Sequence, residues 1–240
     1  VPQMADAEEV FTLANTLKGN LGVLIPNQKG FERAKDVGAS HFNIFYSPSE
    51  AFNERNLGVN RKQAVRHYRD VLWGIPRSNI RVYLSCFFGC PFEGQISEKL
   101  QQECIQEASL LGDTIVLCDT VGVANPNDIR KACSYQRQTH IDFALHLHHR
   151  EGRQAHALSL VREAIDGGIT QIDSSIGGLG GCPFMPDSGG NLATEALVAW
   201  ANLRGLDCGV KYRDVEPIAE QIRRKQFEQL CHYQDSGIRQ

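Results

Sequence analysis

Short apolar runs alternate with longer amphipathic segments along most of the chain. The apolar runs predict six strands, at residues 21–25, 42–46, 80–86, 114–118, 143–148 and 169–173. The longer segments repeat apolar residues three or four positions apart, which predicts helices, including those that begin after the caps Asp6, Asn60, Ser97 and Asn125. Strands and helices that alternate in this way are typical of parallel βαβ units, whose apolar strands are buried on both faces.

Composition limits the classes of protein that fit this pattern. The 240 residues are 42% hydrophobic and 22% charged, which is ordinary for one globular domain. We therefore interpret residues 1–240 as a single α/β domain with C-terminal helices from about residue 193. The net charge of −3 offers no basic surface for nucleic acid, and no apolar run approaches the length of a membrane span. We expect neither nucleic acid nor a membrane as a partner.

The eight cysteines are spread through strand and helix patterns rather than framing short loops. In a domain of this size such spacing favours reduced thiols over a disulfide scaffold. The first residues show no signal or transit pattern. We expect an intracellular protein, cytoplasmic in a bacterium, with the mitochondrion as the alternative compartment in a eukaryote.

Two stretches carry the candidate chemistry. Residues 177–195 read GGLGGCPFMPDSGGNLATE, so Cys182 lies in a loop rich in glycine and proline that presents its thiol rather than packing it. A flexible linker with an incidental cysteine is the alternative. Upstream, His146 and His148 are two residues apart on a predicted strand, so both side chains point to the same side of the sheet. Without a metal, such a pair would be satisfied by hydrogen bonds or water.

The loop sequence resembles the signature of hydroxymethylglutaryl-CoA lyases, which belong to a larger group of metal-dependent TIM barrels. The similar stretches extend from residue 1 to about residue 211, and they are VPQMAD, LIPNQKGFERA, SCFFGCPFEG, CDTVGVANP, HLH, GLGGCPFMP and GGNLATE. The resemblance implies a TIM (β/α)8 barrel, of which six strands are evident here. In the family, two further βα units precede the point that matches Val1, and the first of them carries an Arg-Asp pair whose Asp is a metal ligand.

The resemblance also implies a reaction. Members cleave 3-hydroxy-3-methylglutaryl-CoA to acetyl-CoA and acetoacetate by a metal-assisted retro-Claisen step, in leucine catabolism and ketone body metabolism. The resemblance implies that His146, His148 and Asn191 bind Mg²⁺ or Mn²⁺ and that Cys182 transfers a proton at the reacting carbon. An acyl-CoA thioester is then the expected partner, and a homo-oligomer is compatible with the resemblance.

Position alone adds three weaker candidates. Asp119 follows a predicted strand, where a carboxylate would face the barrel mouth, although a cap or loop hydrogen bond explains it equally well. Asn27 follows an earlier strand and is a candidate for substrate binding. Glu195 is expected behind Asn191, as a partner of the ligands rather than a ligand itself.

Several alternatives stay open at this stage. Cys86 and Cys90 have a weak metal-binding spacing that could join the histidines in a zinc site. Cys182 could also act as a covalent nucleophile, although no base is adjacent to it. A related acyl-CoA condensing synthase is the nearest enzyme alternative, but such relatives carry Glu-Arg where this chain has Cys182 and Pro183.

Departures from the family pattern favour a further alternative, a non-catalytic relative that acts as a binding or structural subunit. His149, Arg150 and Glu151 stand where the family has Asp-Thr after its HxH, and Cys118 replaces a glycine. The upstream Arg-Asp segment has no counterpart in this sequence.

Overall fold

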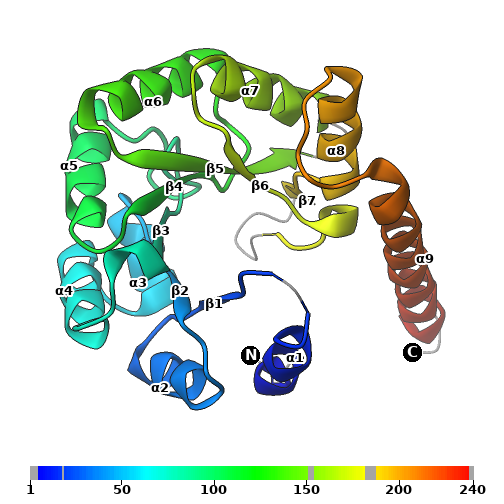
Figure 1. Cartoon of the computed structure of the whole chain (residues 1–240), viewed down its shortest axis with the longest axis horizontal. Helices are drawn as coiled ribbons and strands as arrows, with labels where there is room; N and C mark the ends of the chain where they lie inside the picture. The colour runs from blue at the N-terminus through cyan, green and yellow to red at the C-terminus, as the bar shows by residue number, and fades with distance from the viewer. Residues whose placement is uncertain (1–4, 18, 151–153, 182–187, 238–240) are drawn as a thin grey trace.

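The computed structural model describes residues 5–17, 19–150, 154–181 and 188–237. Six parallel strands, each hydrogen-bonded to the next in sequence order, curl into an open half-barrel (Figure 1). They are β1 (Gly22–Leu24), β2 (His41–Tyr46), β3 (Ile80–Leu84), β4 (Thr114–Asp119), β5 (Asp142–Arg150) and β6 (Gln171–Asp173). The prediction of six parallel strands in an α/β fold is confirmed.

Most of the described helices lie on the outer side of this sheet, and the last one extends away from it (Figure 1). In chain order they are α1 (Ala7–Ala14), α2 (Gln28–Asp36), α3 (Glu50–Leu57), α4 (Arg61–Val71), α5 (Glu98–Ser109), α6 (Pro126–Thr139), α7 (Gln154–Asp166), α8 (Thr194–Leu203) and α9 (Tyr212–Gly237). Two short 3-10 turns, η2 (Arg77–Asn79) and η3 (Ile176–Gly178), complete the described elements. Among these helices none is long and apolar enough to cross a membrane.

The predicted helix caps are mostly correct. The side chains of Asn60, Ser97 and Asn125 each accept a backbone N–H in the first turn of α4, α5 and α6. Asp6 precedes α1 but makes no such bond, and α1 ends at Ala14. Without a capped start this helix lacks one of the local interactions that favour its formation.

Two elements lie outside the predicted pattern. α3 occupies a stretch that reads as a polar loop, and the side chain of Ser49 caps it by accepting the N–H of Phe52. β7 (Ser188–Asn191) pairs antiparallel with β5 and places Asn191 opposite His148. Glycine-rich β7 has no apolar alternation, so only its pairing with β5 makes it a strand.

Side chains of the central strands alternate strictly between two environments. On the outer side, residues such as Leu84, Leu117 and Leu145 pack under the helices and are fully buried in the main apolar core. On the inner side, which we call the lumen, the neighbouring positions carry Tyr83 and His146 instead. Because side chains of a strand alternate between faces, the same strands build a dry core outside and a polar site inside.

Candidate active site in the barrel lumen

The two histidines of β5 lie side by side in the lumen. His146 Nε2 is 3.1 Å from His148 Nε2, so the two rings face each other through the same kind of nitrogen. Burial, reinforced by the neighbouring rings of His146 and His149, lowers the pKa of His148 to about 4. His148 is therefore neutral near pH 7, which is the form of histidine that binds metal ions.

Asn191 joins this pair from β7. It is the register partner of His148, and its Nδ2 donates to the backbone oxygen of Leu179 at 2.6 Å. Because the amide nitrogen binds Leu179, the amide oxygen Oδ1 points away from Leu179. Within the part of the chain that the structure describes, Asn191 Oδ1 is buried without a hydrogen-bond partner, as is His148 Nδ1. Buried polar atoms are rarely left unpaired, so an unpaired acceptor here indicates a position for a ligand.

The donor set fits a divalent cation. Adjacent ligands of an octahedral ion with bonds of about 2.1 Å are about 3 Å apart, and the 3.1 Å between the histidine nitrogens matches that spacing. The described residues contain no cluster of three His, Cys, Asp or Glu side chains that could hold a metal. With two imidazole nitrogens and one amide oxygen, His146, His148 and Asn191 would supply a mixed set of ligands. This set leaves further coordination positions of the ion open.

A carboxylate that the sequence analysis overlooked lies beside His146. Asp173, at the end of β6, is the register partner of His146, and its Oδ2 is 3.7 Å from His146 Nδ1. Its other oxygen accepts from Arg81 Nη2 at 2.9 Å, and the hydroxyl of Tyr83 lies close enough to influence its pKa. Burial alone would raise the pKa of Asp173, but these three neighbours hold it below its ordinary value. The sequence could have indicated this cluster, because alternation along β3 places Arg81 and Tyr83 on the lumen side, as it places the histidines of β5.

A cavity of about 760 Å³ joins these groups. Its lining combines the histidine pair and Asp173 with residues of the neighbouring strands and loops, including Asn43, Tyr83, Cys118, Thr120, Ser174 and Gly181. Burial raises the pKa of the Cys118 thiol well above its ordinary value, so Cys118 fills the lumen as a neutral group. Cys182 lies outside the described residues, but Gly181, which precedes it, lines this cavity. The described part of the loop at residues 177–195, which we call the signature loop, therefore reaches this cavity.

The side chain of Asp119 points away from the lumen. Its two carboxylate oxygens accept the backbone N–H groups of Val123 and Ala124 at 2.9 and 3.1 Å, and its residue is 1% exposed. Burial raises its pKa to about 6, against the effect of these bonds. Alternation along β4 explains the direction, because Cys118 faces the lumen and Asp119 the outer side. The catalytic role of Asp119 stays a prediction, and its observed contacts are those of a loop anchor.

Asn27 and Glu195 also hold backbone in place. Asn27 caps α2 by accepting the N–H of Gly30 at 2.9 Å, so its predicted contact with substrate stays untested. Glu195 is 7% exposed and accepts from the N–H of Gly177 at 3.0 Å and from Arg223 Nη1 at 2.7 Å. It thus links Gly177 to α9, and its predicted role behind the metal ligands stays a prediction.

The two cysteines of the zinc alternative lie away from the histidines. Cys86 and Cys90 pack in a separate apolar cluster with Phe52 and Ile96. Cys90 Sγ donates to Ser49 Oγ at 3.0 Å. This placement gives no support to a site shared with His146 and His148.

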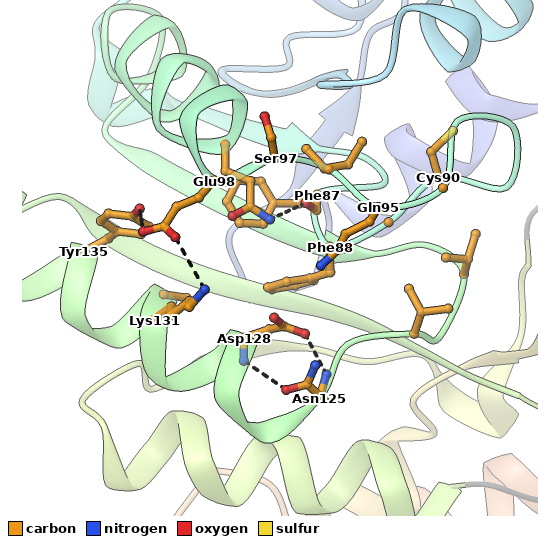
Figure 2. A pocket seen from close by; sticks show the side chains of 17 residues that line it. Phe87, Phe88, Cys90, Gln95, Ser97, Glu98, Asn125, Asp128, Lys131 and Tyr135 are labelled. Atoms are coloured by element: carbon orange, nitrogen blue, oxygen red, sulfur yellow. Dashed lines mark hydrogen bonds and ion pairs between the residues drawn. The ribbon is translucent and has the colours of Figure 1, made fainter.

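A second cavity of about 680 Å³ lies between the loop after β3 and the start of α6 (Figure 2). Its polar side chains already bind one another: Glu98 accepts from Lys131 and Tyr135, and Asn125 exchanges capping bonds with the backbone and side chain of Asp128 (Figure 2). Because these groups are paired, the cavity shows no counterpart of the unpaired atoms in the lumen.

Comparison with known proteins now decides the family. Residues 1–222 match the family described as HMGL-like. This chain belongs to the HMGL-like family.

Relatives of this HMGL-like chain carry the name of one enzyme. The mitochondrial hydroxymethylglutaryl-CoA lyase of Macaca fascicularis is 37% identical over 216 residues, which is 88% of this chain and 66% of that protein. The cytoplasmic 3-hydroxy-3-methylglutaryl-CoA lyase of Homo sapiens is 34% identical and is covered over 58% of its length. This HMGL-like chain thus spans less than two thirds of the length of these relatives.

Solved structures agree with the fold. An HMG-CoA lyase from Acinetobacter baumannii, in complex with coenzyme A and 3-methylmalate, superposes with a TM-score of 0.84 at 31% identity, over 92% of this chain and 73% of that one. The carboxyl transferase domain of Rhizobium etli pyruvate carboxylase reaches a TM-score of 0.63 at 16% identity, which shows a shared fold only. The half-barrel of this HMGL-like chain is therefore a TIM-barrel fold of the lyase type.

Proposed function

We propose that this chain is part of a carbon–carbon lyase that cleaves 3-hydroxy-3-methylglutaryl-CoA to acetyl-CoA and acetoacetate. The observation that carries the proposal is the lumen geometry. His146 and His148 face each other at 3.1 Å, and Asn191, whose side-chain oxygen has no partner among the described residues, ends the loop that gives the sequence its likeness to lyases. The protein would act where acyl-CoA is available, in the cytoplasm or the mitochondrion, the two compartments named for its relatives.

A divalent cation, Mg²⁺ or Mn²⁺, would be held by His146, His148 and Asn191. Bound there, the cation would make the tertiary hydroxyl of the substrate more acidic. The chain's own contribution is to fix these ligands. Asn191 is oriented by Leu179, and both histidines stand on β5, which pairs with strands on either side.

The reaction needs two proton transfers, one from the hydroxyl group to a base and one to C2. The hydroxyl proton leaves as the bond between C2 and C3 breaks, and the electron pair of that bond stays on the thioester fragment as an enolate. A proton must then reach C2 to give acetyl-CoA. We assign that second proton to Cys182, since it follows directly on Gly181 in the sequence and Gly181 lines the cavity. Closure of the loop would also exclude water from the enolate.

Turnover of the substrate tests the proposal directly. Purified protein is incubated with 3-hydroxy-3-methylglutaryl-CoA and Mg²⁺, and acetoacetate and acetyl-CoA are measured. We expect equal amounts of both products, and His148→Ala should reduce turnover at least a hundredfold. His140→Asn is the matched control, because His140 is an exposed residue at the end of α6 whose left-handed backbone asparagine tolerates.

The non-catalytic alternative rests on the departure from the family pattern after the HxH. The same assay separates the two functions. Absence of turnover together with binding of the acyl-CoA thioester would favour a binding subunit. The intact mass and N-terminal sequence of the natural protein would then show whether its own chain carries the Arg-Asp segment of the family.

A further inference from the structure

We infer that Asp173 is a positioning residue that fixes the proton of His146 on Nδ1 and so leaves Nε2 free to bind. The inference rests on the proposed function, since it assigns support to the same histidine pair. It goes beyond it, because Asp173, Arg81 and Tyr83 form a support that reaches across the lumen and that no ligand assignment includes.

The carboxylate is aimed at one nitrogen of the ring. Asp173 and His146 are register partners on adjacent parallel strands, and Asp173 Oδ2 is 3.7 Å from His146 Nδ1. This distance is longer than a direct hydrogen bond, so the carboxylate acts on the ring through its charge. A negative charge beside Nδ1 stabilises an N–H that points toward it and destabilises a lone pair in the same place.

The contact between the histidines supports the same assignment. At 3.1 Å, one Nε2 must donate and the other must accept. If His146 donated, its Nδ1 would direct a lone pair at Asp173, and the buried Nδ1 of His148 would carry an N–H without a partner among the described residues. If His148 donates, His146 presents its Nδ1–H to the carboxylate, and only an acceptor of His148 stays unpaired. The second arrangement has the lower electrostatic cost.

Asp173 is itself held from the opposite side of the half-barrel. Arg81 reaches from β3 to β6, past β4 and β5, and its Nη2 binds Asp173 Oδ1 at 2.9 Å. The space for this crossing comes from the small lumen side chains of the intervening strands, Val116 and Ala144, against which Tyr83 packs. Because Arg81 binds Asp173 Oδ1, the carboxylate has less freedom to turn away from His146.

The tautomer can be measured without any metal. Nitrogen-15 NMR of the imidazole rings in the metal-free protein, with His146 assigned by its loss in His146→Gln, reports which nitrogen carries the proton. We expect Nδ1–H in the wild type. A proton on Nε2 of His146 in the wild type would overturn the inference, and this measurement requires no variant of Asp173 to fold.

Binding of Mn²⁺ gives the second measurement. Asp173→Asn keeps the shape of the side chain but removes its charge, and we expect binding 10- to 100-fold weaker by electron paramagnetic resonance, with both His146 tautomers present. Asp142→Asn, at the exposed start of β5, is the matched control and should bind as the wild type does. Wild-type affinity in Asp173→Asn would contradict the inference. If the wild type itself binds no Mn²⁺, that result counts against the proposed function, and the tautomer still decides the role of Asp173.

Discussion

The two faces of the central strands differ in polarity and in role, although they share one backbone. Most outward positions of β3, β4 and β5 are aliphatic or aromatic and almost wholly buried under the helices, with Asp119 as an exception. Inward positions include Arg81, His146 and Asp173, which are only partly buried and bind one another. Apolar burial on one face stabilises the strands, and that stability holds a costly group of polar side chains in place on the other. Changes on the two faces should therefore affect different properties.

Neighbouring residues of β5 provide the strongest contrast. Leu145 is fully buried on the outer face, so Leu145→Ala should lower the free energy of unfolding by about 2–5 kcal/mol. His146→Ala, one residue later in the lumen, should cost less than about 1 kcal/mol and should abolish binding of Mn²⁺. Urea denaturation and metal titration check both variants. Equal destabilisation by the two substitutions would remove the distinction between the faces.

Metal binding in the lumen should stabilise the folded protein. If His148 and Asn191 are ligands, Mn²⁺ at a hundred times its dissociation constant should raise the free energy of unfolding by about 2.7 kcal/mol. A chelator should reverse the gain. Thermal unfolding with and without Mn²⁺ measures the effect, and His148→Ala should lose it. A gain of the same size in His148→Ala would place the ion elsewhere.

Asp119 is a charge on the face that is otherwise apolar, and its pKa of about 6 predicts a pH dependence. The folded state binds this proton more tightly than the unfolded state, whose pKa is near 3.9. Stability is therefore lost as the pH rises from about 4 to about 6, by roughly 1.4 kcal/mol per pH unit. Asp119→Asn should lack this slope, which urea denaturation at pH 4.5 and 6.5 would show. Parallel profiles for variant and wild type would mean that the carboxylate is not held as described.

The smallest effect is expected at the end of the lumen. Glu195 accepts from Gly177 and Arg223 while almost buried, so Glu195→Gln should cost about 1–2 kcal/mol and make the loop after Gly177 more sensitive to protease. Glu220→Gln removes an exposed helical ion pair with Arg224 instead, and it should leave stability and cleavage unchanged. Equal behaviour of the two variants would show that Glu195 does not restrain the loop.

The sequence pattern predicted the outer face well and the lumen only in part. Apolar runs locate all six parallel strands, and caps such as Asn125 mark helix starts, because both signals are local. Alternation was applied to His146 and His148 but not to Asp119, whose outward direction follows from the same rule. Neighbouring strands could have suggested Arg81 as well.

Other features depend on contacts that no local pattern encodes. The ion pair of Arg81 with Asp173 joins residues 92 positions apart. β7 reads as a glycine-rich loop and becomes a strand only through its pairing with β5. The short helix α3 has too weak an apolar face to stand out from a polar loop.

The pairing of β7 with β5 has a thermodynamic consequence for the signature loop. Asn191 is the register partner of His148, and its amide binds Leu179 at the other end of the loop. A ligand that binds Asn191 and the histidines more tightly when β7 is paired with β5 would therefore stabilise this pairing. Linkage is reciprocal, so the pairing would strengthen binding at the histidines by the same factor. Affinity at the histidines and the pairing of β7 with β5 could then not be tuned separately.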